Sequence, residues 1–207
     1  PRVDLELGAL YFRMGSFGRI QESAQAGMQS GGVGAYVALE NINDDGWREF
    51  SPTTIKRMYT DLGFKGDNSE FHINFTGADN KYGVTAAAPE ALLATGWDRA
   101  FTNPQITDNQ LEMVSVNGQI KVAPATVLSG VGYYRHFKQE HSDGNIADFG
   151  ACDPANGFIC EDGGTGDEVV DIHGIPIHDP GGVLGSIDST SQDADSFGFS
   201  LQAVNKS

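Results

Sequence analysis

The chain has 207 residues, and its 28 acidic side chains outnumber 13 basic ones to give a formal net charge of −15. This balance argues against nucleic-acid binding, because phosphate recognition needs clustered Lys and Arg. Hydrophobic residues make up 39% of the chain, too many for a disordered acidic tail. No run approaches the roughly 18 apolar residues of a transmembrane helix. Glycine, with 27 residues, is about double its usual share of roughly 7%, and we predict an all-β chain.

Both ends of the chain alternate between apolar and polar residues, as strands do. Val3, Leu5, Leu7 and Ala9 are expected on one face of the first strand, and no secretory leader is expected before it. The last segment, 197–205, is still alternating where the sequence stops. We therefore expect both ends to be cut rather than finished.

The clearest strand covers residues 71–76. Its apolar face carries Phe71, Ile73 and Phe75, and its other face carries His72, Asn74 and Thr76. Similar alternation brings the expected number of strands to about eight, and residues 111–122 are expected to change face near Val114. The other segments lie at 3–9, 19–28, 34–43, 56–64, 125–137 and 197–205.

The connections between these strands alternate in length. Short turns are expected at 29–32, 65–69 and 123–125, where turn-forming residues cluster. The intervening connections lie near 15–16 and at 43–52, 79–107 and 139–195, so the longest ones should share one end of the strands. A short helix is expected at 89–94, where Pro precedes an alanine-rich stretch.

Sorted connections and two-faced strands are typical of an antiparallel up-and-down transmembrane β-barrel with short periplasmic turns and long extracellular loops. The residues opposite the apolar rows would face a wet lumen, because a Lys or Arg facing lipid at the midplane costs about 2–4 kcal/mol. Aromatic residues near the strand ends would form the interfacial girdles, although a β-sandwich core would explain each of them equally well. They are Tyr11, Phe12, Phe64, Tyr133 and Tyr134.

Four segments resemble the early barrel of TonB-dependent outer-membrane receptors, and they occur in the order found in that family. The resemblance spans most of residues 3–137 and resumes at 196–205. The four segments are Gly15-Ser16-Phe17-Gly18-Arg19, Asn43-Asp44-Asp45-Gly46-Trp47-Arg48-Glu49-Phe50-Ser51-Pro52, Phe101-Thr102-Asn103-Pro104 with Thr107-Asp108-Asn109-Gln110-Leu111, and Gly132-Tyr133-Tyr134-Arg135.

The resemblance implies a 22-stranded barrel in the outer membrane of a Gram-negative bacterium, with a plug domain preceding the barrel. It also implies uptake of a ferric siderophore or a similar scarce nutrient, driven through the inner-membrane TonB complex. Residues 1–207 would then be a partial barrel of about eight strands, without the plug domain and the remaining strands. Expected ligand or plug contacts are Trp47, Arg48, Arg57, Tyr59, Asp61, His72, Asn74, Trp97 and Arg99.

Cys152 and Cys160 lie in the longest acidic connection. An isolated pair in an exported loop predicts a disulfide, because the cell surface is oxidising. Two free thiols are the alternative, and a metal site is less favoured because no second Cys or His pair accompanies them. Asn41–Gly46 begins like a calcium loop, but Pro52 occupies the position of the closing Glu.

No motif for an enzyme or a cofactor is found: there is no Gly-x-Ser-x-Gly elbow, no His-Glu-x-x-His, no Walker loop and no dinucleotide fingerprint. We therefore expect a protein that is not an enzyme. The resemblance implies that its partners are outer-membrane lipid, its own plug domain, the inner-membrane TonB complex and a small-molecule ligand. Two other hypotheses remain open. One is a complete eight-stranded outer-membrane adhesin or structural barrel, and the other is a soluble β-sandwich binding module.

Overall fold

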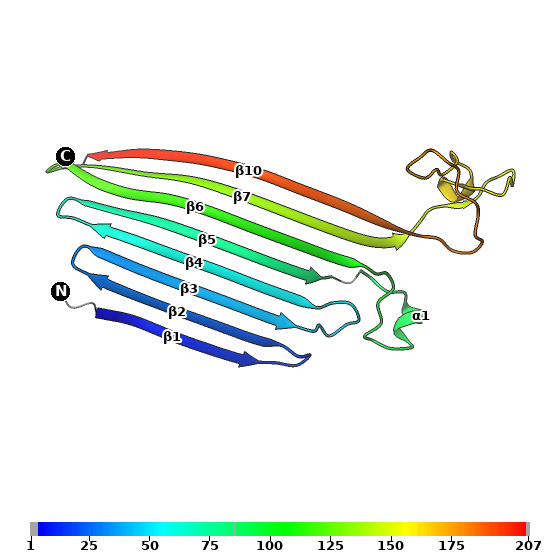
Figure 1. Cartoon of the computed structure of the whole chain (residues 1–207), viewed down its shortest axis with the longest axis horizontal. Coiled ribbons are helices and arrows are strands. Elements are labelled where there is room, and N and C mark those ends of the chain that lie inside the picture. The colour runs from blue at the N-terminus through cyan, green and yellow to red at the C-terminus, as the bar shows by residue number, and fades with distance from the viewer. Residues whose placement is uncertain (1–3, 85, 206–207) are drawn as a thin grey trace.

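The computed structural model describes residues 4–84 and 86–205, with the side chains of 4–7 left out. Eight antiparallel strands follow one another across a single sheet in the order β1-β2-β3-β4-β5-β6-β7-β10 (Figure 1). The all-β, up-and-down arrangement predicted from the alternation is confirmed. The strands are β1 (Asp4–Met14), β2 (Ile20–Ser30), β3 (Val33–Asp44), β4 (Thr53–Lys65), β5 (Ser69–Gly83), β6 (Gln105–Ala123), β7 (Thr126–Ile146) and β10 (Gly185–Asn205).

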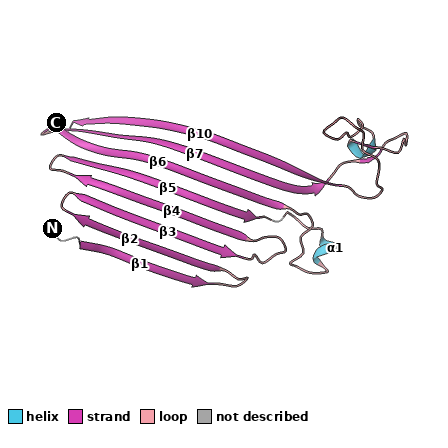
Figure 2. Ribbon diagram, in the orientation of Figure 1, coloured by secondary structure: helices cyan, strands magenta, loops and turns pink. Residues whose placement is uncertain are grey.

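The connections are sorted by length between the two ends of the sheet (Figure 2). Turns at 31–32, 66–68 and 124–125 lie at one end, where β1 begins and β10 ends. Connections 15–19, 45–52, 84–104 and 147–184 lie at the other end, which we call the long-loop end. Connection 84–104 contains the expected short helix, α1 (Glu90–Leu93). The sorting predicted from the sequence is therefore present.

The sheet is open. Strand β1 pairs with β2 and β10 pairs with β7, and these two edge strands do not pair with each other. A closed eight-stranded barrel, one of the alternatives left by the sequence, is not formed. Among the described residues, no helix is long and apolar enough to cross a membrane.

The described residues form one eight-stranded sheet and a two-stranded sheet, which consists of β8 (Gly150–Ala151) and β9 (Ile159–Cys160) within connection 147–184. Figure 1 shows no second layer stacked on the large sheet. Phe71 and Ile73 are each 42% exposed, whereas a sandwich would bury this row between its two layers. The structure therefore does not have the architecture of a β-sandwich.

The register places two uncharged rows of side chains on one face of the sheet, which we call the apolar face. Side chains directly opposite each other in an antiparallel pair lie on the same face. One row crosses the sheet as Ala26–Val37–Thr60–Phe75–Val114–Tyr134–Phe197. The next row towards the short turns is Met28–Ala35–Leu62–Ile73–Val116–Gly132–Phe199.

We call this uncharged part of the apolar face the apolar band. On β4 it runs from Met58 to Phe64, and at roughly 3.3 Å per residue this is about 20 Å along the strand. Outer-membrane barrels have an apolar band roughly 25 Å tall. The opposite side, which we call the polar face, carries Tyr59 and Asp61 on β4 and His72 and Asn74 on β5. The apolar band is therefore suited to contact with lipid, and the polar face is suited to contact with water.

Two details differ from the sequence analysis. A register shift between Leu5 and Leu7 leaves Ala9 opposite Gln25, on the polar face, so the expectation that Ala9 joins the apolar row is wrong; Val3 lies outside the described residues. The change of face expected near Val114 is present, because Leu111 and Met113 lie on the polar face and Val114 and Val116 on the apolar face. Strands β7 and β10 have 21 residues each and continue beyond the apolar band into segments expected to be loop.

Candidate functional site

The centre of the polar face is a network of side chains from β2 to β6. The Tyr36 hydroxyl donates to Gln25 Oε1 at 2.8 Å, and the rings of Tyr36 and Tyr59 are 6.2 Å apart. Asn74 Nδ2 donates to the Tyr59 hydroxyl at 3.0 Å, and Asn117 Nδ2 donates to Asn74 Oδ1 at 2.9 Å. Each of these side chains is fixed by a neighbour on another strand.

His72 joins this network to two carboxylates. Its Nδ1 lies 2.8 Å from Asp61 Oδ1, and its Nε2 lies 3.5 Å from Glu70 Oε1. Gly63 lies directly opposite His72 in the register, and the space that a side chain would need there is filled by the imidazole ring. The structure thus brings together four of the expected contact residues: Tyr59, Asp61, His72 and Asn74.

Arg57 lies outside this cluster, closer to the long-loop end. Its Nη1 is 3.5 Å from Glu40 Oε2, and Glu40 Oε1 accepts a hydrogen bond of 2.9 Å from Gln21 Nε2. A hollow of about 560 Å³ on the polar face is lined by Arg57, Tyr59 and Glu40, among others. The polar face therefore offers donors, acceptors and both signs of charge to a solute beside it.

A second group of expected contacts joins connections 45–52 and 84–104 at the long-loop end. Arg48 Nε donates to the Arg99 carbonyl oxygen at 3.1 Å, and Arg48 Nη1 donates to the Ala86 carbonyl oxygen at 3.2 Å. Arg99 Nη1 donates to Glu49 Oε1 at 2.8 Å, and the Ala100 amide donates to Glu49 Oε2 at 3.3 Å. Arg48 and Arg99 therefore hold the two connections together.

Two tryptophans are exposed on this joined pair of loops. Trp47 is 57% exposed and Trp97 is 78% exposed. The Arg48 guanidinium lies 5.5 Å from the centre of the Trp47 ring, within the range of a cation–π contact. The contacts between the two connections fix the backbone near Trp47 and Trp97, while the side chains of both tryptophans stay accessible to a ligand.

Glu49 is a residue of this site that the sequence analysis did not assign. It lies in a segment quoted for its resemblance, but no local spacing links it to Arg99, which is 50 residues away in the chain. Charge alone does not identify it, because the chain has 28 acidic residues. Only the packing of the two connections shows its role.

Asp44 joins the first two hairpins at the same end. The Gly46 amide and Arg19 Nη1 each donate to its carboxylate at 2.9 Å. These two donors, the backbone amide first, lower the pKa of Asp44, which lies beyond the apolar band at the end of β3. Gly46 has a φ of 81°, and a side chain on it would overlap Ser51. The turn therefore requires glycine at this position.

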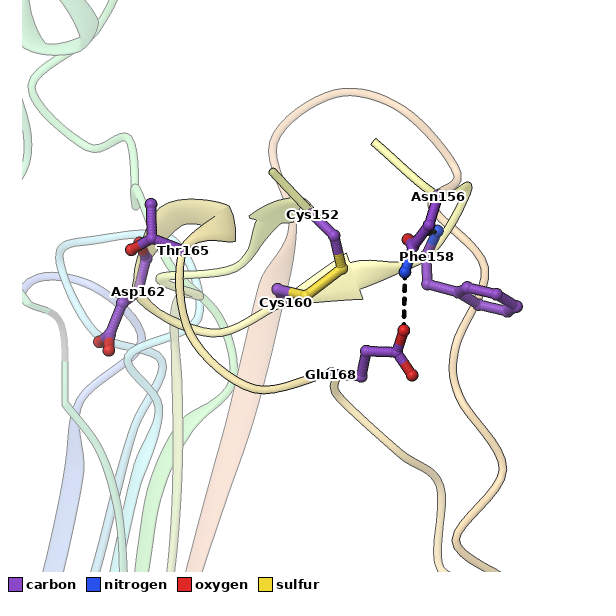
Figure 3. The surroundings of a disulfide bond; sticks show 7 residues. All are labelled: Cys152, Asn156, Phe158, Cys160, Asp162, Thr165 and Glu168. Carbon is purple, nitrogen blue, oxygen red and sulfur yellow. Dashed lines mark hydrogen bonds between the residues drawn. A yellow bond between two sulfur atoms is a disulfide. The ribbon is translucent and has the colours of Figure 1, made fainter. Parts of the chain in front are cut away.

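Connection 147–184 contains a folded unit around a disulfide (Figure 3). The sulfur atoms of Cys152 and Cys160 are joined, and both residues are buried. Asn156 Nδ2 donates to Glu168 Oε1 at 2.7 Å, and the ring of Phe158 stacks on His178 with centres 4.6 Å apart. Ile159 is buried between backbone hydrogen bonds to Val169 and Ile177. This connection thus has a small core of its own.

Comparisons with protein-family models, with curated proteins and with solved structures return no match for the chain. The fold and the side chains described above therefore carry the functional interpretation. They define a two-faced antiparallel sheet with a polar network on one face, an uncharged band on the other, and joined loops at one end.

Proposed function

We propose that the chain is part of the barrel of a TonB-dependent receptor that takes up a ferric siderophore or a similar scarce nutrient across the outer membrane. The observation that carries this proposal is the division of one sheet into a face with an uncharged band and a hydrogen-bonded polar face. A sheet in lipid needs an uncharged outer face, and it needs its ladder closed by further strands. Further strands of the receptor would pair with the open edges of β1 and β10.

The proposed mechanism assigns different work to the two ends of the polar side. Trp47 and Trp97, on connections joined by Arg48, Glu49 and Arg99, would make the first contacts with the ligand. Ligand and plug would then meet the polar face, where Arg57 and the Tyr59–Asp61–His72–Asn74 cluster offer hydrogen bonds. Energy would come from TonB through the plug domain.

The insertion part of the proposal is tested by labelling single cysteines in the whole encoded protein, which would supply the further strands, after reconstitution into lipid vesicles. The described residues contain no free cysteine, so Ile73→Cys and Asn74→Cys each introduce one new thiol on opposite faces. A membrane-impermeant maleimide should label Asn74→Cys and spare Ile73→Cys, whereas a lipid-soluble maleimide should label Ile73→Cys. Equal labelling of both positions by the impermeant reagent would contradict the proposal.

The transport part is tested in the organism that encodes the chain. Deleting the gene should abolish growth on a ferric siderophore as the only iron source, and growth on excess ferrous salt should be unchanged. Normal growth of the deletion strain on every siderophore tested would count against iron uptake and leave another nutrient as the ligand.

A further inference from the structure

Trp97 stands at the tip of a tight turn in connection 84–104. The Arg99 amide donates to the Gly96 carbonyl oxygen at 3.3 Å, so Trp97 and Asp98 are the two central residues of this turn. The turn is also held by the neighbouring connection, because the Glu49 amide donates to the Asp98 carbonyl oxygen at 2.8 Å. An indole that is 78% exposed is therefore presented from a fixed backbone.

The carboxylate of Asp98 belongs to the same turn. A Cβ added to Gly96 would lie 2.9 Å from Asp98 Oδ1, so the carboxylate folds back over this glycine. Asp98 is exposed, as Trp97 is. The face of an indole ring is electron-rich and attracts cations, and a carboxylate accepts charge-assisted hydrogen bonds from them. The turn thus presents two consecutive side chains that both favour a cation.

The arginines beside this turn are already engaged within the protein. Arg99 Nη1 donates to Glu49 Oε1 at 2.8 Å, and the Arg48 guanidinium donates to two backbone carbonyl oxygens. Arg48 also lies over the ring of Trp47, 5.5 Å from its centre, and Trp97 is the more exposed of the two rings. An anionic ligand would have to break these contacts to gain an arginine.

Acidic side chains outnumber basic ones around the turn. Connections 45–52 and 84–104 contain four carboxylates against two arginines. Connection 147–184 lies at the same end of the sheet and adds eight acidic residues and no Lys or Arg (Figure 1). A surface dominated by one sign of charge raises the local concentration of ligands with the opposite sign. The long-loop end therefore attracts cations and repels anions.

We propose that the ligand carries a net positive charge and places an ammonium group on the ring of Trp97, beside Asp98. This inference rests on the proposed function and specifies the ligand of the same site. Among ferric siderophores it selects hydroxamates that bear a free amine, which is protonated at neutral pH. Hydroxamate groups balance the charge of the ferric ion, so the amine makes the complex cationic, whereas catecholates leave their complex anionic.

The test is isothermal titration calorimetry of the whole encoded protein in detergent micelles with ferrioxamine B, a ferric hydroxamate that bears a free ammonium group. Two derivatives are the matched ligands, because acetylation of the amine makes the complex neutral and succinylation makes it anionic. Affinity should fall in this order, with a loss of about tenfold on acetylation. Equal affinities, a preference for either derivative, or no binding of ferrioxamine B would overturn the inference.

Variants of the turn locate the cation. Trp97→Leu keeps an apolar side chain but removes the aromatic ring, so it should weaken binding of ferrioxamine B about tenfold and change binding of the acetylated complex less than about twofold. Asp98→Asn should also weaken binding of the cationic complex selectively. Glu90→Gln is the matched control, because it removes one charge from the same connection but in the first turn of α1.

Unchanged binding in Trp97→Leu, or equal losses in Asp98→Asn and Glu90→Gln, would overturn the assignment of the cation to this turn. The proposed function is judged separately, by growth of the deletion strain. If that strain fails to grow on an anionic ferric siderophore, the protein is still a receptor for iron uptake, and the inference of a cationic ligand fails.

Discussion

At the scale of single residues, the charged side chains described at the long-loop end form hydrogen bonds and ion pairs that link one connection to another. Arg48 and Arg99 were expected to contact a ligand, yet the side chain of each donates hydrogen bonds to the other connection of the pair 45–52 and 84–104. Arg19 likewise pairs with Asp44 of the next hairpin. The sequence identified the segments but not these pairings, because partners separated by 25 or 50 residues leave no local pattern.

Glu49→Gln should loosen the joined connections. The substitution removes the charge that accepts hydrogen bonds from Arg99 and the Ala100 amide, and a hydrogen bond to a charged group is worth about 1.5–3 kcal/mol. Since both side chains are partly exposed, we expect a local effect near or below the lower figure. Faster hydrogen exchange at the Ala100 amide should report it.

Glu90→Gln provides the control, because Glu90 lies in connection 84–104 with Ala100 but in the first turn of α1, away from Glu49 in the chain. It should leave exchange at Ala100 unchanged. If Glu49→Gln also leaves that exchange unchanged, the Glu49 contacts do not hold the two connections together.

At the scale of elements, the sequence predicted most of the strands and the face on which their residues lie, because side chains alternate between the two faces of a strand. Phe71, Ile73 and Phe75 share a face as expected, and the sorted connections follow from the same strand assignments. Two kinds of detail escaped this reasoning. A register shift near Leu5 depends on pairing with β2. The polar outer halves of β7 and β10 pair residue by residue, although their composition resembles that of a loop.

Removing the disulfide should destabilise connection 147–184 and spare the large sheet. The chain-entropy model gives about 2.5 kcal/mol for a loop of this size. The elements β8, β9 and the 3₁₀ turn Asp162–Gly164 contact one another and not the strands of the large sheet. Replacing Cys152 and Cys160 with Ser should therefore speed proteolysis within 147–184 alone.

Limited proteolysis with mass spectrometry measures this effect, and the fragments from β2 to β6 serve as an internal control. Cleavage that spreads into those strands at the same rate would show that the disulfide also stabilises the large sheet.

At the scale of the whole molecule, the described chain presents an uncharged band on one face of the sheet and two unpaired strand edges. Phe197, Phe199 and Leu201 on β10 are each more than 80% exposed. Exposed apolar surface and open edges both favour association in water. The net charge of −15 opposes this association but is concentrated elsewhere: connection 147–184 holds eight acidic residues and no Lys or Arg, giving 0 − 8 = −8.

The chain should therefore form large particles in detergent-free buffer and disperse in micelles. Light scattering before and after detergent exchange measures this change, and the cysteine-free double variant serves as a control because its edges are unaltered. A stable, monodisperse monomer in water would contradict the two-solvent interpretation of the sheet.

The length of β7 and β10 has a consequence for access from outside. From Phe197, at the outer limit of the band, to Gly185 there are about 40 Å of strand at roughly 3.3 Å per residue. On the proposed orientation, this hairpin lifts residues 147–184 away from the surface (Figure 1). An antibody too large to enter the interior could still reach this segment, which makes it the epitope of choice for detecting the protein on intact cells.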